Sequence, residues 1–228
     1  MRSATAPTGR APRHPAALVA ATALPALALA ALGSSHPAML TPESASWWRD
    51  LHVIGLVLFP LLALGPWAVV RAARPAGPVG WLLEGLAVVL GVVYATFYSA
   101  LDALAGVGGG HETIRLGPGP WVSALFEIGD ALGVYGSYAY LAASVLAAVL
   151  ALVRAPGAWR LLAVVGALFA VAGAWSYLTS HIYWPYGVAT MVMLAIGHTA
   201  LVVAATRRST DRAGTAPDRP VGASSPRE

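Results

Sequence analysis

The sequence predicts an all-α fold, a polytopic bundle of six transmembrane helices. Of the 228 residues, 57% are hydrophobic and 11% are charged, whereas a soluble domain carries about 25% charged residues. Six apolar runs follow one another along the chain, each of about 20 residues, which is enough for a helix to span a hydrocarbon core of roughly 30 Å. The runs lack the polar alternation of β-barrel strands, and a lone strand would leave its backbone groups unpaired in lipid.

The first apolar run, 15–33, follows a segment rich in arginine and proline, 1–14, which is expected to be a disordered N-terminus. Two interpretations of the run remain open. It forms the first membrane span, or it is the apolar core of a signal peptide that is cleaved after a small-residue pattern such as Ala26-Leu27-Ala28. Cleavage would leave five spans without changing the orientation of the others.

The second and third runs, 51–70 and 81–103, are joined by a short loop with proline and glycine, which end one helix and begin the next. A long connection over 104–130 follows. Its glycine-rich start at 106–110 predicts a turn. Apolar residues at helical spacing over 121–130 predict a short amphipathic helix on the membrane surface.

The last three runs occupy 131–153, 159–179 and 184–206. They complete a predicted transmembrane domain over 15–206. The segment that follows, 207–228, is rich in Pro, Ser, Gly and charged residues and has little apolar surface to bury. We expect it to be a disordered tail.

The fourth run, taken together with the residues 121–130 before it, is too long for one straight membrane span. One helix over 121–153 would measure about 50 Å, so a break is expected near Gly129 or Gly133. Small residues at four-residue spacing, these two glycines and the pair Gly166 and Ala170, let helices approach closely. They predict a tightly packed bundle or a homo-oligomer.

The arginines predict the orientation of the bundle. If six helices alternate, twelve of the 14 arginines fall on one side, and Arg49 and Arg115 fall on the other. Short basic segments stay in the cytoplasm, so both termini are expected there. We therefore expect a multi-pass protein of a bacterial cytoplasmic (inner) membrane, with the lipid bilayer around it. The basic termini lack the aromatic or motif context of nucleic-acid binding, so no nucleic-acid partner is expected.

The chain has no cysteine, and all of its basic residues are arginine. This excludes disulfides, thiolate metal sites, iron–sulfur clusters and thiol nucleophiles. It also excludes a lysine Schiff base. We expect either no cofactor or a divalent metal such as zinc, which histidine and carboxylate side chains can bind.

Polar residues gather on the predicted outer side, where six of the ten acidic residues map. Four of the six histidines also map there, namely His36, His52, His111 and His181. The candidate metal ligands, which the spans bring to one depth, are His52, Asp102, Glu127, Asp130 and His181. Asp102 and Ser99, three residues apart on one helical face, are the candidate catalytic residues. Alternatively, these are solvated interfacial groups, and Asp102 bonds to a neighbouring helix.

His198 is a separate candidate. It lies about 14 residues into the last run, roughly 21 Å deep by the helical rise. An ionisable residue inside a membrane suggests a functional role, and His198 is a candidate for a proton path. The alternative is a neutral imidazole that bonds to a facing hydroxyl or to a backbone carbonyl.

Two resemblances can be stated on these residues. The segment Phe97–Gly106, F-Y-S-A-L-D-A-L-A-G, resembles uncharacterised small multi-pass bacterial integral membrane proteins, which implies an inner-membrane location. The chain also resembles the alkaline ceramidase and adiponectin-receptor hydrolases, which use a serine, an aspartate and three histidines on several spans. The matching residue types here are Ser99, Asp102, His52 and His181. The His-x₃-His pair of that family's last span is absent, and His198 stands alone there.

Three functions are compatible with the sequence. The first is a non-enzymatic integral membrane protein that packs with or supports a membrane partner. The second is a metal-dependent intramembrane hydrolase with an outward-facing site of His, Asp and Glu. The third is a proton-coupled transporter of small solutes that uses Asp102 and His198.

Overall fold

The structure, a computed structural model, describes residues 15–74 and 76–214, with side chains as far as Arg207. The described residues form an all-α bundle without strands, which confirms the predicted fold class. In chain order, the elements are α1 (Pro15–Gly33), α2 (Ala45–Leu61), α3 (Leu64–Ala73), α4 (Pro78–Leu101), the π-helical segment η1 (Asp102–Gly108), α5 (Gly109–Leu116), α6 (Pro120–Arg154), α7 (Trp159–Ser180) and α8 (Tyr186–Gly214).

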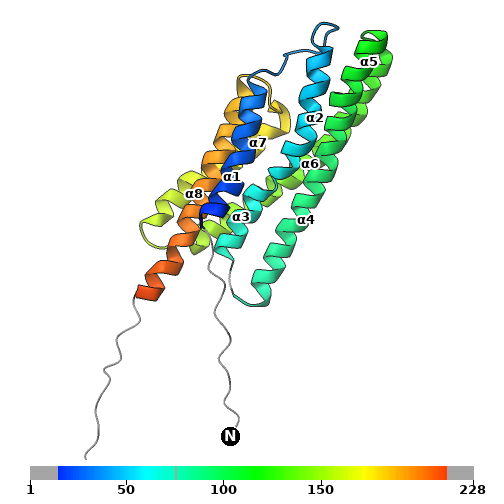
Figure 1. The fold of residues 1–228 in the computed structure, drawn as a ribbon. Helices are drawn as coiled ribbons and strands as arrows, with labels where there is room; N and C mark the ends of the chain where they lie inside the picture. The colour runs from blue at the N-terminus through cyan, green and yellow to red at the C-terminus, as the bar shows by residue number, and fades with distance from the viewer. Residues whose placement is uncertain (1–14, 75, 215–228) are drawn as a thin grey trace, which may run out of the picture.

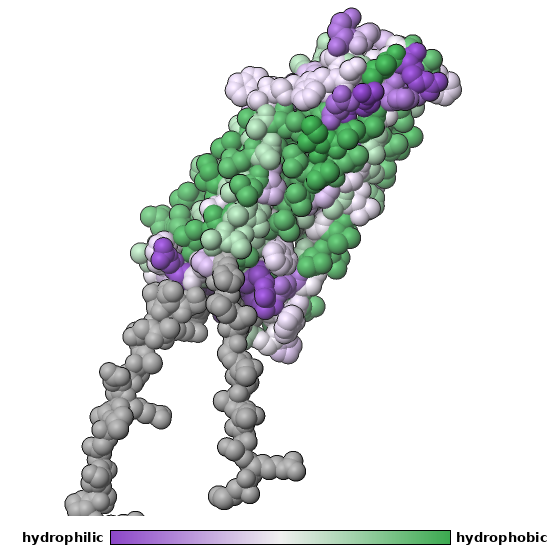
Figure 2. All heavy atoms as spheres, in the orientation of Figure 1, coloured by the Kyte–Doolittle hydropathy of each residue, from purple (hydrophilic) through white to green (hydrophobic). Residues whose placement is uncertain are grey.

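Six helical segments of the described residues are long and apolar enough to cross a membrane. They are α1, α2 with α3, α4 with η1 and α5, α6, α7, and α8 as far as Arg207. A broad hydrophobic band covers the visible face of the bundle, with hydrophilic residues gathered at its two ends (Figure 2). These are the features of an integral membrane protein.

The helices are arranged as two packed groups that share α6. In one group α8 packs along α7 and α1, and in the other α4 packs along α6, which also contacts α7. We call the upper end of the bundle in Figure 1 the end at which α1 and α7 end and α2, α6 and α8 begin. At the opposite, lower end, α1 begins and α8 ends, which is what an even number of spans requires.

Two prolines divide the second span into α2 and α3. Pro66 has no N–H to donate to the carbonyl of Leu62, four residues earlier, and that carbonyl accepts from the backbone N–H of Gly65 instead (2.9 Å). The turn between the helices tightens at Pro60, whose carbonyl accepts from Ala63 (3.2 Å). The second span therefore bends where α2 ends and α3 begins.

The prediction of a turn at 106–110 is wrong, because the third span continues as helix through η1 and α5 to Leu116. The glycines serve close packing instead. A Cβ on Gly110 would lie 2.8 Å from Cβ of Arg49, and a Cβ on Gly109 would lie 2.9 Å from the ring of Phe126. The π-helical turn inserted at Asp102 marks a local change in register of a kind that is frequent at functional sites.

The prediction of a break near Gly129 or Gly133 is also wrong, because α6 is continuous over 35 residues. Gly133 packs against the side chain of Leu101, and a Cβ on Gly129 would lie 3.1 Å from Cβ of Ala105. The predicted surface helix over 121–130 is the first part of α6. At about 1.5 Å per residue, α6 measures about 52 Å and extends beyond the hydrocarbon layer at the upper end.

At the termini the structure covers only part of the predicted segments. The predicted disordered N-terminus, 1–14, and the tail beyond Gly214 lie outside the described residues. Between 207 and 214 the chain continues α8, so this part of the predicted tail is helical. The first apolar run packs within the bundle as α1, where the hydroxyls of Thr22 and Thr199 are 2.9 Å apart.

Candidate metal centre

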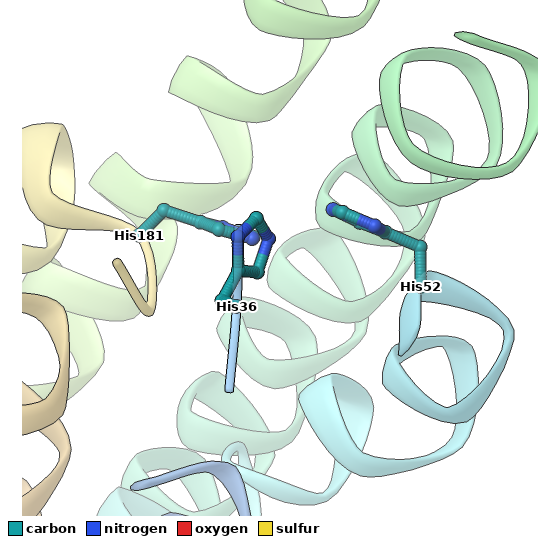
Figure 3. Close-up of side chains that lie close together, drawn as sticks. All are labelled: His36, His52 and His181. Carbon is teal, nitrogen blue, oxygen red and sulfur yellow. The ribbon is translucent and has the colours of Figure 1, made fainter. Parts of the chain in front are cut away.

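Three histidines from three different segments meet at the upper end of the bundle. His36 lies in the link after α1, His52 on α2, and His181 directly after α7. One ring nitrogen of each histidine lies within 4.8 Å of the others. Figure 3 shows the side chains of His52 and His181 extending toward each other from opposite sides, with His36 between them.

The three rings have a defined mutual orientation. The rings of His52 and His181 are nearly parallel, at an interplanar angle of 9° and a centroid distance of 5.7 Å. The His36 ring stands edge-on to both, at 5.1 Å from His52 and 5.6 Å from His181. Three imidazoles in this arrangement enclose one common point.

Backbone carbonyls fix the tautomers of two of these histidines. The Nδ1–H of His36 donates to the carbonyl of Pro37, and the Nδ1–H of His52 donates to the carbonyl of Trp48, both over 2.7 Å. A carbonyl can only accept, so the proton of each neutral ring is on Nδ1 and the lone pair is on Nε2. In metal-binding histidines, the ring nitrogen that does not bind the metal typically donates its N–H to such a group.

His181 is held by a side chain instead. Its Nδ1 lies 2.6 Å from the hydroxyl of Tyr98 on α4. The residue ends α7 with a positive φ of 44°, a conformation that is costly for a residue with a side chain and that concentrates at functional sites. The Nε2 atoms of His181 and of His36 are buried and have no hydrogen-bond partner among the described residues.

Asp102 adds a carboxyl group to the cluster. Its Oδ1 lies 3.9 Å from Nε2 of His52. The side chain is completely buried, and neither carboxylate oxygen has a hydrogen-bond partner among the described residues. Gly55 on α2 packs directly against Oδ2, so a side chain at this position would collide with the carboxylate. A buried carboxylate without a partner is costly, and a bound cation would offset that cost.

The protonation state of His36 and His181, which lie outside the membrane-spanning helices, favours metal binding. Burial lowers the pKa of His36 below the ordinary value of 6.5, against a smaller opposite effect of the hydrogen bond to Pro37. Burial, together with the nearby rings of His52 and His36, lowers the pKa of His181 well below 6.5. Both imidazoles are therefore neutral at pH 7, the form that binds metal ions.

The donor set fits a divalent transition metal. A tetrahedral zinc ion with Zn–N bonds of about 2.0–2.1 Å holds its nitrogens about 3.3 Å apart. The three rings would have to close by about 1.5 Å to reach that geometry. Imidazole nitrogens with a nearby carboxylate oxygen suit zinc and other borderline metals.

A cavity of about 430 Å³ adjoins the cluster. His52 and His181 line it, together with residues of α4, η1, α6 and α7 and the loop after α7. Its volume is within the range of small-molecule sites, about 300–1,000 Å³. A molecule in this cavity would contact the histidines directly.

The structure brings together some of the predicted site residues and separates others. His52, Asp102 and His181 meet at the cluster. Asp130 is exposed on α6 and lines the cavity, outside the histidine cluster. Glu127 is exposed and, like the partly buried Ser99, is not among the lining residues of the cavity.

The candidate ligand that the sequence did not single out is His36. It maps to the predicted outer side, as His111 does, and the sequence offers no pattern that separates the two. His36 is buried against the cluster, whereas His111 is exposed. The difference depends on how the link after α1 folds over the bundle.

His198 has hydrogen-bond partners on both ring nitrogens. Nδ1 donates to the carbonyl of Leu194 (3.1 Å), and Nε2 lies 3.4 Å from the hydroxyl of Ser144. The side chain is buried. This is the arrangement of the alternative interpretation, a neutral core histidine.

Comparison with known proteins gives no relative, since no family model, no curated protein and no solved structure matches the chain. The site must therefore be interpreted from its own geometry.

Proposed function

We propose that this protein is a divalent-metal-dependent hydrolase of the membrane, with its active site at the upper end of the bundle. The observation that carries this proposal is the convergence of three histidine rings beside the unpaired carboxylate of Asp102. The resemblance to the intramembrane zinc hydrolases points in the same direction, although this chain supplies His36 from a link and not from a last-span motif.

Each residue has a role that follows from its position. His36, His52 and His181 would hold the ion through Nε2, because their Nδ1 atoms are engaged elsewhere. Trp48 and Pro37 orient two of the rings through their carbonyls. A divalent ion held by three histidines lowers the pKa of water and polarises a carbonyl group.

Asp102 is the proposed general base and acid. In hydrolysis, a water oxygen bonds to the substrate carbonyl carbon, and Asp102 accepts the proton that the water loses. The bond from that carbon to the leaving group then breaks, and Asp102 returns the proton to the leaving group. A carboxylate buried near the metal ligands is suited to both steps.

The site favours catalysis over a purely structural metal. Structural zinc sites have four protein ligands, whereas catalytic sites have three and leave a position for water or substrate. Here three histidines form the cluster among the described residues. Two of them, His52 and His181, also line the cavity.

The experiment is metal analysis combined with activity. The full chain, purified in a maltoside detergent, should contain about one equivalent of zinc or another divalent metal, and His36→Ala should lose it. His111→Ala, an exposed histidine at the same end, is the matched control and should keep it. A panel of ester and amide substrates should give chelator-sensitive hydrolysis. A purified chain that takes up no metal would overturn the proposal.

We also propose a bacterial cytoplasmic membrane with both termini inside, so that the metal site faces outward. In support, Arg71, Arg74, Arg154 and Arg160 lie on the segments of the lower end, as the positive-inside rule requires. A reporter fused after Glu228 should be active only in its cytoplasmic form. An exported reporter would contradict this orientation.

The partner-supporting role and proton-coupled transport stay predictions, as does a homo-oligomer. Transport is less favoured by the contacts of His198, which has a partner on each nitrogen. Below it, the described core is an aliphatic cluster that includes Val69, Ala147 and Leu201. Such a core offers a proton little polar support.

A further inference from the structure

The cavity beside the histidines has an unusual lining. Five aromatic side chains and one carboxylate contribute to it, namely Trp48, Tyr98, Phe126, Tyr177, Tyr183 and Asp130. No arginine is among its lining residues, and the chain has no lysine. The cavity is thus rich in π-electron density and has an anionic group without a cationic neighbour in its wall.

The aromatic residues of the lining form two groups of contacting rings, which we call the two walls. In one wall, the Trp48 ring lies 5.8 Å from Phe126 and 6.2 Å from Tyr183. In the other wall, the rings of Tyr98 and Tyr177 stack at 4.8 Å. Both walls line the same cavity, so a ligand group in it can contact rings of either wall.

Asp130 supplies the charge. Its side chain is exposed on α6 and makes no ion pair with any described residue, so it is available to a ligand.

We infer that this cavity binds an alkylammonium group, held between the aromatic walls and paired with Asp130. Aromatic faces attract ammonium ions, and cages of several rings recognise quaternary ammonium groups. If the proposed hydrolase function holds, on which this step rests, the substrate is an ester or amide that carries an ammonium group. That group sits at Asp130, and the scissile carbonyl reaches the histidines.

The test compares choline with its neutral carbon analogue, 3,3-dimethylbutan-1-ol, which has the same shape without the charge. Binding to the full chain in maltoside detergent is measured by isothermal titration calorimetry. Choline should bind about tenfold more tightly or better. Equal affinity for the two compounds would overturn the inference.

Two variants locate the binding. Asp130→Asn should abolish the preference for choline, whereas Glu127→Gln, which removes an exposed carboxylate on the same helix outside the cavity, should keep it. Phe126→Ala should weaken choline binding several-fold. A preference that survives Asp130→Asn would contradict the assignment.

Two further arms separate the sources of the ligand and the two proposals. A short-chain phosphocholine lipid is compared with choline as a competitor for the cavity. If the lipid competes more strongly than choline, the ammonium group belongs to a lipid headgroup. If it competes more weakly, the ammonium group belongs to a small free molecule. The choline preference is also measured in the native chain after its metal has been removed with a chelator. There it should persist, because the ammonium site does not need the metal. A native chain that binds no metal but still prefers choline would overturn the proposed hydrolase function and leave the ammonium site standing.

Discussion

Gly106 packs against the imidazole ring of His52, so closely that a Cβ on this glycine would overlap the ring. The contact joins η1 to α2 and sets the position of one proposed metal ligand. The ring is held from the other side by the carbonyl of Trp48. The backbone of a residue without a side chain is therefore part of the proposed metal site.

Gly106→Ala should displace the His52 ring and weaken zinc binding about 10- to 100-fold, as loss of outer support does in other metal sites. Competition with a chromophoric chelator measures the affinity. Gly85→Ala is the matched control, since no atom lies within 4 Å of the added Cβ. Equal affinities in the two variants would show that the glycine contact does not position His52.

Tyr98→Phe should weaken zinc binding by about tenfold, because His181 loses the hydroxyl that holds its Nδ1. The phenyl ring still fills the space, so thermal stability of the metal-free protein should change little. The same chelator competition applies, with Tyr135→Phe, an exposed tyrosine on α6, as the control. A loss of affinity as large in Tyr135→Phe would indicate a general effect of tyrosine removal.

Asp102→Asn should keep zinc within a few-fold but lower hydrolysis by about 10²- to 10⁴-fold, the usual contribution of a general acid–base group. The metal-free variant should also unfold at a higher temperature, because a buried, unpaired carboxylate has been removed. Metal content, turnover and thermal unfolding are measured on the same preparation. Unchanged turnover would remove Asp102 from the mechanism.

Acid should destabilise the metal-free protein at a pH set by its histidines. The pKa values of His36 and His181 are lowered in the folded state, so below the ordinary value of 6.5 the unfolded chain binds more protons. Stability is then complete above about pH 6.5 and falls as the pH drops from there toward the lowered values. Thermal unfolding across this range should show the fall, and His36→Ala should reduce it. A profile that is flat in the native chain would contradict the burial of these imidazoles.

Much of the fold could be predicted from the sequence because membrane spans depend on length and hydrophobicity alone. Six segments that can span a membrane were expected, and six are observed. Depth could also be predicted: His52, Asp102 and His181 occur near the same ends of their spans, and they do meet. Lateral position could not be predicted, since it depends on which helix faces pack.

The glycines of the third span show where a local sequence pattern fails to predict the secondary structure. A run such as 106–110 is typical of a turn when it is considered alone. In the bundle, Gly106 admits the His52 ring and Gly110 admits the backbone of α2 near Arg49, so tertiary packing keeps the segment helical. Trp48 and Tyr183, near the ends of their spans, both line the cavity. The rings are turned inward by neighbours that are distant in sequence.

His36, His52 and His181 are proposed to bind one divalent ion together. X-ray absorption spectroscopy of the zinc-loaded full chain can detect this, because it counts the imidazole ligands of the metal. We predict three imidazole nitrogens at about 2.0–2.1 Å, and a changed shell in His36→Ala but not in His111→Ala. A shell of oxygen ligands alone, or the same shell in a variant that lacks all three histidines, would contradict the account.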